Sequence, residues 1–155
     1  MVRCLLILIL FIMAGLSFGS ENHLPDGYWK TIDDGSGEAK SIVYIWKEKD
    51  VYYGKVHEIL NDERKDVLCD KCEGERKGKP VLGMTIMWDL KENDGEYDGG
   101  QILDPDNGKT YKCKMKVNEE GTELTVRGYI GFSLIGRSQV WHRVENALEK
   151  LPDSQ

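Results

Sequence analysis

The sequence predicts an all-β protein, a small antiparallel up-and-down barrel of eight strands. Short runs rich in Val, Ile, Tyr, Thr and Trp recur between turns of Gly, Asp and Asn, which is the pattern of strands joined by hairpins. The sequence does not show the pattern of alternating strands and helices that is typical of a parallel sheet. Closure removes the exposed edges of an antiparallel sheet, so a barrel is expected. A two-sheet sandwich is the alternative.

Each of the eight strands is expected where such a run occurs. The sixth is the clearest, because Tyr111, Cys113 and Met115 alternate with lysines, which indicates one buried and one solvent-exposed face. The turns Asp94-Gly95 and Asn107-Gly108 supply glycine where a hairpin needs positive φ. Neighbouring strands should therefore pair antiparallel. The expected strands are 28–32, 40–46, 51–59, 81–90, 97–103, 109–117, 122–130 and 137–144.

One helix is expected, at the C-terminal end of the chain. Val144, Leu148 and Leu151 recur at helical spacing, which predicts a short helix over residues 145–151. A helix this short is not stable alone, so it should dock on the barrel.

Residues 1–19 have the features of a cleavable signal peptide, which leaves residues 20–155 as one domain. Arg3 precedes an apolar run, and small residues at Ser17 and Gly19 favour cleavage after Gly19. The run of about 14 residues is shorter than the roughly 20 that span a bilayer, so no transmembrane span is expected after signal removal. An uncleaved anchor is the alternative. A secreted or periplasmic protein of the cell envelope is expected.

The charge of the chain disfavours nucleic-acid binding. Signal removal takes one basic residue, Arg3, from 21 and none of the 27 acidic residues, which leaves a net charge of −7. A nucleic-acid-binding domain of this size would be basic.

The cysteines of the expected domain divide into a pair and a single residue. Cys69 and Cys72 lie in a long connection, residues 60–80, without strand or helix periodicity. In an exported protein the pair predicts a structural disulfide that pins this loop; a metal site and free thiols are the alternatives. Cys113 should be a free thiol inside the barrel. No metal or cofactor is predicted.

Two blocks of sequence resemble a known family. Residues 128–143, from Gly128 to Arg143, and residues 104–111 closely resemble the bacterial domain-of-unknown-function family 2147. The likeness extends over nearly all of the chain after the signal peptide. It implies an exported bacterial protein with a compact barrel similar to the lipocalin-like calycins, and no established activity.

The resemblance also implies how the barrel closes. Calycins carry a Gly-x-Trp on the first strand and a basic residue near the end of the last, stacked across the indole. Gly27-x-Trp29 and Arg143 match this arrangement. Such a cation–π contact contributes about 0.5–2 kcal/mol, so Trp29 and Arg143 are expected to close one end of the barrel.

The expected function is the binding of a small apolar ligand inside the barrel. Strands two, four and six each present aromatic or apolar side chains that could converge on an acyl or aromatic ligand. A small barrel can also be filled by its own side chains, and the alternative is an envelope structural or protein-interaction module without a ligand. No catalytic grouping is recognised, and the sequence identifies no protein partner. The expected pocket residues are Tyr44, Trp46, Met84, Trp88, Tyr111, Cys113 and Met115.

Overall fold

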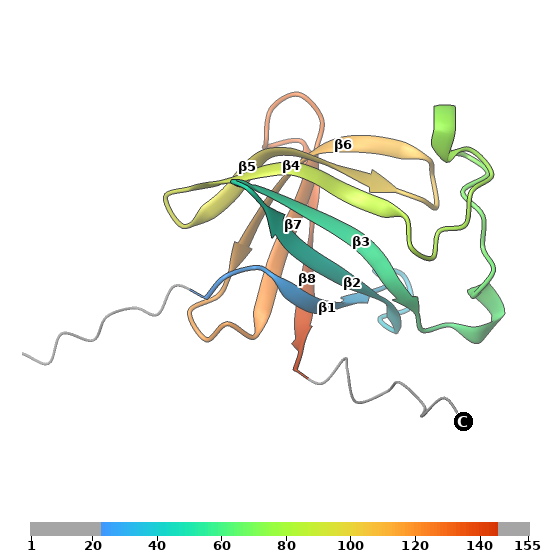
Figure 1. Ribbon diagram of the computed structural model, residues 1–155, viewed down its shortest axis with the longest axis horizontal. Helices are drawn as coiled ribbons and strands as arrows, with labels where there is room; N and C mark the ends of the chain where they lie inside the picture. Colours follow the sequence, from blue (N-terminus) through green and yellow to red (C-terminus); the bar gives the residue numbers. More distant parts are fainter. Residues whose placement is uncertain (1–22, 146–155) are drawn as a thin grey trace, which may run out of the picture.

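Residues 23–145, which the computed structural model describes, form a closed antiparallel barrel in which each strand pairs with the next and the last pairs with the first (Figure 1). The expected all-β antiparallel barrel of eight strands is confirmed. The strands are β1 (Gly27–Ile32), β2 (Ala39–Glu48), β3 (Val51–Ile59), β4 (Thr85–Asn93), β5 (Glu96–Asp104), β6 (Lys109–Val117), β7 (Glu123–Tyr129) and β8 (Gly136–Val144).

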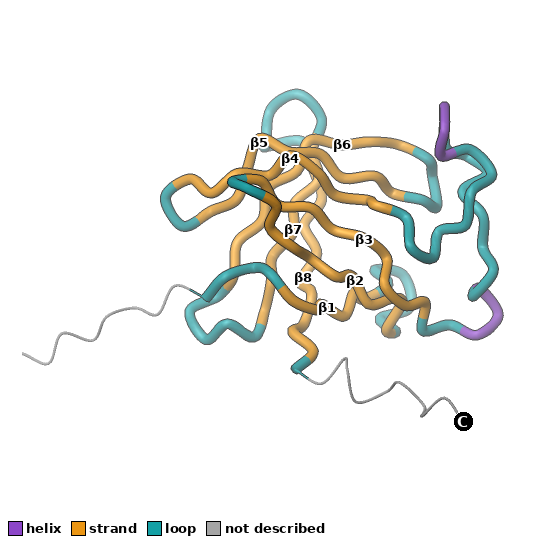
Figure 2. Tube along the Cα trace, viewed as in Figure 1, coloured by secondary structure: helices purple, strands orange, loops and turns teal. Residues whose placement is uncertain are grey.

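Two sequence-based expectations fall on other parts of the chain. The signal peptide over residues 1–19 lies outside the described residues, and so does the expected C-terminal helix beyond Glu145. Within residues 23–145 the helices are two short 3-10 turns, η1 (Asp62–Arg64) and η2 (Gly74–Arg76), both in the connection between β3 and β4 (Figure 2).

The fourth strand begins later than the sequence pattern indicates, at Thr85 instead of residue 81. The residues before it form a turn, in which the Met84 N–H donates to the Val81 carbonyl at 3.0 Å and Gly83 has a φ of 81°. A positive φ of this kind is open to glycine and costly for most other residues. Val81 and Met84 are buried as the apolar run predicts, but Leu82 is 49% exposed and the segment is a turn instead of a strand.

A bulge in β4 changes which of its side chains point into the barrel. Tyr52 and Gly54 are two residues apart on β3, yet their partners Leu90 and Met87 are three apart on β4. Asp89, with a φ of 63°, lies between those partners. An extra residue in one strand interrupts the alternation of side chains between the two faces.

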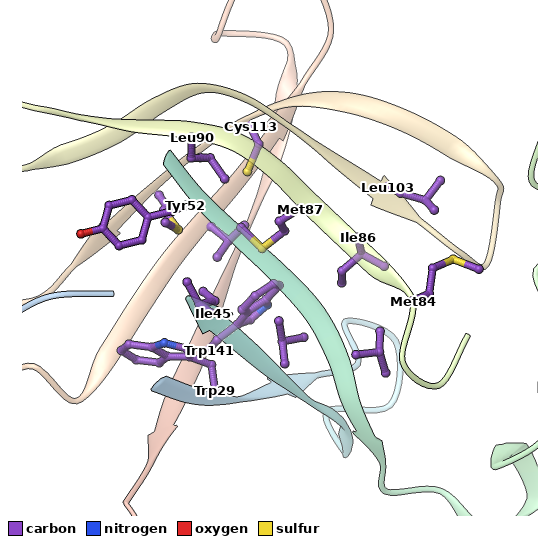
Figure 3. Close-up of a cluster of buried hydrophobic side chains, with 14 of the residues drawn as sticks. Trp29, Ile45, Tyr52, Met84, Ile86, Met87, Leu90, Leu103, Cys113 and Trp141 are labelled. Carbon is purple, nitrogen blue, oxygen red and sulfur yellow. The ribbon is translucent and has the colours of Figure 1, made fainter. Parts of the chain in front are cut away.

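Core side chains fill one half of the barrel, toward the β2–β3, β4–β5 and β6–β7 turns, and the core continues along the inner faces of the strands in the other half. Figure 3 shows side chains from several strands that meet across the barrel interior. Burying each large apolar side chain contributes about 1.5–3 kcal/mol. The residues that fill the half toward these turns are Trp29, Ile45, Tyr52, Met87, Leu90, Tyr97, Cys113, Met115 and Leu124.

Candidate functional site

The other half of the barrel contains an open cavity of about 630 Å³. Its mouth lies among the four loops at that end, residues 33–38, 60–84, 105–108 and 130–135. The wall of the cavity is built from apolar side chains on the inner faces of the strands. The main wall residues are Val43, Val56, Ile59, Ile86, Ile102, Leu103, Val126 and Trp141.

A cluster of three charged side chains lies on one side of the mouth. Asp106 accepts a hydrogen bond from Arg64 Nη2 at 2.7 Å and another from Lys40 Nζ. Its own backbone N–H donates to Asp104 Oδ1 at 3.0 Å, which holds the loop in place. Burial alone would raise the pKa of Asp106, but the hydrogen bonds from Lys40 and Arg64 outweigh it and lower the pKa below the usual range. Asp106 is therefore ionised at neutral pH.

A chain of polar contacts runs along β8 from Trp141 in the cavity wall to Asp34 in the β1–β2 loop at the mouth. Trp141 Nε1 donates to Gln139 Oε1 at 3.0 Å, and Gln139 Nε2 donates to Asp34 Oδ2 at 2.8 Å. Arg137 pairs with the same carboxylate oxygen at 2.6 Å. These contacts connect the β1–β2 loop to β8 beside the mouth.

The long β3–β4 connection forms another side of the mouth and contains the disulfide that the sequence predicts. Cys69 and Cys72 are bonded to each other, and the Cys69 N–H donates to the Lys79 carbonyl at 2.8 Å. The same loop packs on the β5–β6 turn so closely that a Cβ at Gly108 would lie 2.0 Å from the Lys71 carbonyl oxygen. The disulfide thus stabilises a loop that borders the cavity.

The structure places the seven expected pocket residues in different environments. Tyr111 lines the cavity, and its hydroxyl accepts a hydrogen bond from Asn107 Nδ2 at 3.1 Å. Met84, the last residue of the β3–β4 connection, is buried in the core, whereas Cys113 and Met115 fill the packed half of the barrel. Burial raises the pKa of the Cys113 thiol to about 12, so this free cysteine stays protonated at neutral pH.

Tyr44 and Trp46 lie on the outer face of β2, which corrects the expected pocket. Their rings stack with centroids 5.9 Å apart, and Lys55 Nζ lies 5.8 Å from the Tyr44 ring centroid. The alternate residues Val43 and Ile45 point inward and are fully or almost fully buried. Because both faces of this strand are apolar, hydrophobic alternation alone selects neither face.

Trp88 also lies outside the cavity, although the sequence places it with Ile86 on the inner face. A second irregularity in β4 interrupts the alternation on which that assignment depended, because the consecutive residues Gly54 and Lys55 on β3 pair with Met87 and Thr85, which are two residues apart on β4. The Trp88 ring is half-buried under the guanidinium of Arg76, 4.5 Å from the ring centroid. The β3–β4 loop therefore covers this ring.

Sequence reasoning missed the polar residues of the mouth. Lys40, Arg64, Asp106 and Arg137 come from four separate segments, and their spacing along the chain carries no motif. One signal could have found them. Charged residues lie next to the ends of expected strands, and the loops at one end of a barrel converge, so such residues are candidates for a shared site.

The opposite end of the barrel is closed by Trp29 and Arg143. The guanidinium carbon of Arg143 lies 4.2 Å from the Trp29 ring centroid. Arg143 donates to the Gly121 carbonyl at 2.5 Å, to the Asp26 carbonyl at 3.0 Å and to the Leu24 carbonyl at 2.6 Å. One side chain thus ties the segment before β1 to the β6–β7 turn.

Within residues 23–145, no group of three or more His, Cys, Asp or Glu side chains is placed to bind a metal ion. The same part of the chain contains no helix long and apolar enough to cross a membrane.

Acid is expected to remove the stabilisation that Asp106 provides at the mouth. Because the folded pKa of Asp106 is lowered, its ion pairs stabilise the fold above the unfolded Asp pKa of about 3.9. That contribution is lost as the pH falls through the lowered folded value. The difference in unfolding free energy between the wild type and Asp106→Asn, measured by urea denaturation across pH, should shrink toward zero in acid. A difference that does not change with pH would contradict this.

Comparison with known proteins identifies a family and a fold. The family described as "Uncharacterized protein conserved in bacteria (DUF2147)" matches residues 27–143. Among solved structures, the chain is similar to protein HP1028 from the human pathogen Helicobacter pylori, which is described as belonging to the lipocalin family. The TM-score is 0.70 at 19% identity, over 81% of this chain and 86% of that one. No curated protein matches the chain. The barrel is therefore lipocalin-like.

Proposed function

The chain belongs to the DUF2147 family of uncharacterised bacterial proteins, and we propose that its barrel binds a small ligand with an apolar acyl or aromatic body. The observation that carries this proposal is the open cavity of about 630 Å³. Pockets for small molecules commonly measure about 300–1,000 Å³, and most are lined by apolar side chains with a few polar groups. The cavity has both properties.

The apolar wall and the polar mouth favour an amphipathic ligand in one orientation. Val56, Ile86 and Val126 are almost fully buried and offer no hydrogen-bonding group in their side chains. The polar groups lie at the mouth, where Lys40, Arg64 and Asp106 form their cluster and Arg137 pairs across from β8. A ligand would therefore place its apolar body inside and its polar end among these side chains.

The alternative function, a filled barrel that acts only as a structural or interaction module, is less well supported. A filled barrel needs close packing along its whole interior, as protein cores normally have. In this chain Met87, Cys113 and Met115 pack in the core, but the interior between Val56, Ile86 and Val126 is an open cavity. This cavity supports ligand binding.

We also propose that the protein is exported to the periplasm or cell envelope. The N-terminal segment with Arg3, the following apolar run and the small residues before position 20 supports this. The Cys69–Cys72 disulfide supports it further, because disulfides persist in oxidising compartments.

Filling the cavity is expected to abolish ligand binding while leaving the fold intact. Gly128 lines the cavity, and a Cβ built there makes contacts of 3.5 Å with Ile102 and Tyr111, which are ordinary van der Waals distances. Gly128→Leu should place a side chain in the space of the ligand. A fluorescent fatty acid titrated into the delipidated protein should bind saturably, and Gly128→Leu should weaken that binding by about tenfold or more.

The matched control is Gly128→Ala, which adds one methyl group at the same position and should bind the probe nearly as well as the wild type. Circular dichroism and thermal denaturation establish that both variants are folded. If the folded wild type shows no saturable binding, or if Gly128→Leu binds with unchanged affinity, the proposed function is wrong.

A further inference from the structure

The loop between β7 and β8 holds four of the eight large apolar side chains that are exposed in the described part of the chain. Four of its side chains are mostly exposed: Ile130 by 62%, Phe132 by 81%, Leu134 by 91% and Ile135 by 70%. The loop extends beyond the strands that carry it (Figure 1). Single exposed apolar residues are common, but four within six residues indicate an interaction site.

The loop that exposes these side chains is ordered by hydrogen bonds. Arg127, on the outer face of β7, donates to the Ser133 carbonyl through Nε at 2.8 Å and through Nη2 at 2.6 Å. The Ile130 N–H donates to the Ile135 carbonyl at 3.1 Å, and the Ile135 N–H donates to the Phe132 carbonyl at 3.1 Å. These bonds hold the backbone in one conformation and leave the Phe132 ring in solvent.

The surface beside this loop is basic, although the chain as a whole is acidic. Residues 124–144 contain no Asp or Glu, and neither do residues 107–118, in a chain of net charge −6. On the adjoining strand, Lys112 pairs in register with Tyr129 beside the loop, and Lys114, whose Nζ lies 3.7 Å from Glu96 Oε2, pairs with Arg127. Apolar side chains flanked by basic ones are typical of segments that bind anionic membrane surfaces.

We propose that the β7–β8 loop docks the protein on an anionic lipid surface, with Phe132 and Leu134 inserted between the lipids. Ile130 and Ile135 belong both to the loop and to the lining of the cavity mouth. Docking in this way brings the mouth of the cavity to the membrane surface. Membrane docking goes beyond the proposed binding of a ligand in solution, and the docking proposal does not depend on ligand binding.

A lipid surface fits the loop better than a protein partner does. A stable protein interface usually takes about 20–30 residues from each partner over complementary surfaces, and the exposed apolar loop has six residues. A bilayer requires no matching shape, and a few inserted apolar side chains with nearby basic residues suffice for reversible binding.

The test is flotation of the purified mature protein with ligand-free vesicles. Vesicles of phosphatidylcholine containing about one third phosphatidylglycerol should carry the protein to the top of the gradient, and added salt should weaken this binding. The double variant Phe132→Ser, Leu134→Ser should lower the partition coefficient by about tenfold or more.

The matched control is Leu24→Ser, which removes another exposed leucine, at the end of the barrel that Trp29 and Arg143 close. It should leave the partition coefficient unchanged. Binding of the fluorescent fatty acid in solution should also be unchanged in the double variant, because neither Phe132 nor Leu134 lines the cavity. A failed docking result is thereby distinguishable from a failed ligand-binding result.

Three outcomes would overturn the proposal. The first is a wild type that does not float with anionic vesicles, and the second is a folded double variant that floats as well as the wild type. The third is a wild-type dimer that Phe132→Ser, Leu134→Ser converts to a monomer in size-exclusion chromatography without vesicles. That result would assign the loop to contact between two copies of the chain.

Discussion

Gly100→Ala is expected to lower the free energy of unfolding by about 3 kcal/mol or more, among the largest effects of any single methyl group in this barrel. Gly100 is buried on β5, opposite Cys113 on β6. A Cβ at Gly100 would lie 2.5 Å from the Trp88 carbonyl oxygen, 2.6 Å from Leu90 Cγ and 2.7 Å from the Leu90 backbone nitrogen.

The clash at Gly100 is severe because two of the three atoms belong to the backbone of β4. A change of side-chain rotamer could move Leu90 Cγ, but it could not move the backbone atoms of Trp88 and Leu90. The bulge at Asp89 lies between these two residues. Relief would therefore require the bulge itself to shift, which couples the stability of the fold to this irregularity.

Urea denaturation of Gly100→Ala beside Gly128→Ala measures this effect. The control adds the same methyl group at a position where the nearest atoms are 3.5 Å away, so its unfolding midpoint should stay close to that of the wild type. Equal midpoints for the two variants would show that β4 does not approach Gly100 as described.

Arg143→Ala should lower the free energy of unfolding by about 3 kcal/mol, because the guanidinium makes both a cation–π contact and charge-assisted hydrogen bonds. Its contacts are the Trp29 ring and three carbonyl groups, those of Leu24, Asp26 and Gly121. Figure 3 shows Trp29 at the edge of the packed core. Loss of Arg143 would uncover this ring and leave three carbonyls without their donor.

Two further variants separate the causes of this loss. Arg143→Lys keeps the charge and much of the aliphatic stem but not the planar, forked donors, so it should recover only part of the stability. Arg137→Ala removes an exposed guanidinium paired with Asp34 and should cost about 1 kcal/mol or less. If Arg143→Ala denatures at the same urea concentration as Arg137→Ala, closure by Arg143 is not important for stability.

The order and pairing of the strands could be predicted because local sequence determines them. On β6 the apolar residues Tyr111, Cys113 and Met115 alternate with lysines, and the structure places the strand at Lys109–Val117, the range expected from sequence. The disulfide was likewise predictable, because Cys69 and Cys72 are close along the chain and lie in a long connection without strand or helix periodicity, which a disulfide can stabilise.

The lining of the cavity could not be predicted in the same way. On β2 both faces are apolar, and the larger rings of Tyr44 and Trp46 suggest the wrong one. Val43 and Ile45 occupy the interior instead and are fully or almost fully buried. On β4 the irregular register is a property of the strand pair, and the sequence around Trp88 carries no sign of it.

The mouth of the cavity depends on tertiary structure alone. Lys40, Arg64 and Asp106 meet because the start of β2 and two loops lie at the same end of a closed barrel. Charged residues in loops are common, so their types do not distinguish a ligand-binding mouth from an ordinary solvated surface. Only the closed topology brings them together.

The measurement that tests ligand binding in the cavity most directly is methyl NMR of the isoleucine side chains during titration with a medium-chain fatty acid. Ile86 and Ile102 line the cavity, whereas Ile45 lies in the packed half of the barrel. A ligand in the cavity should shift the Ile86 and Ile102 methyl signals saturably and leave the Ile45 signal nearly unchanged. An absence of saturable shifts at Ile86 and Ile102, or shifts at Ile45 as large as theirs, would contradict the proposed binding site.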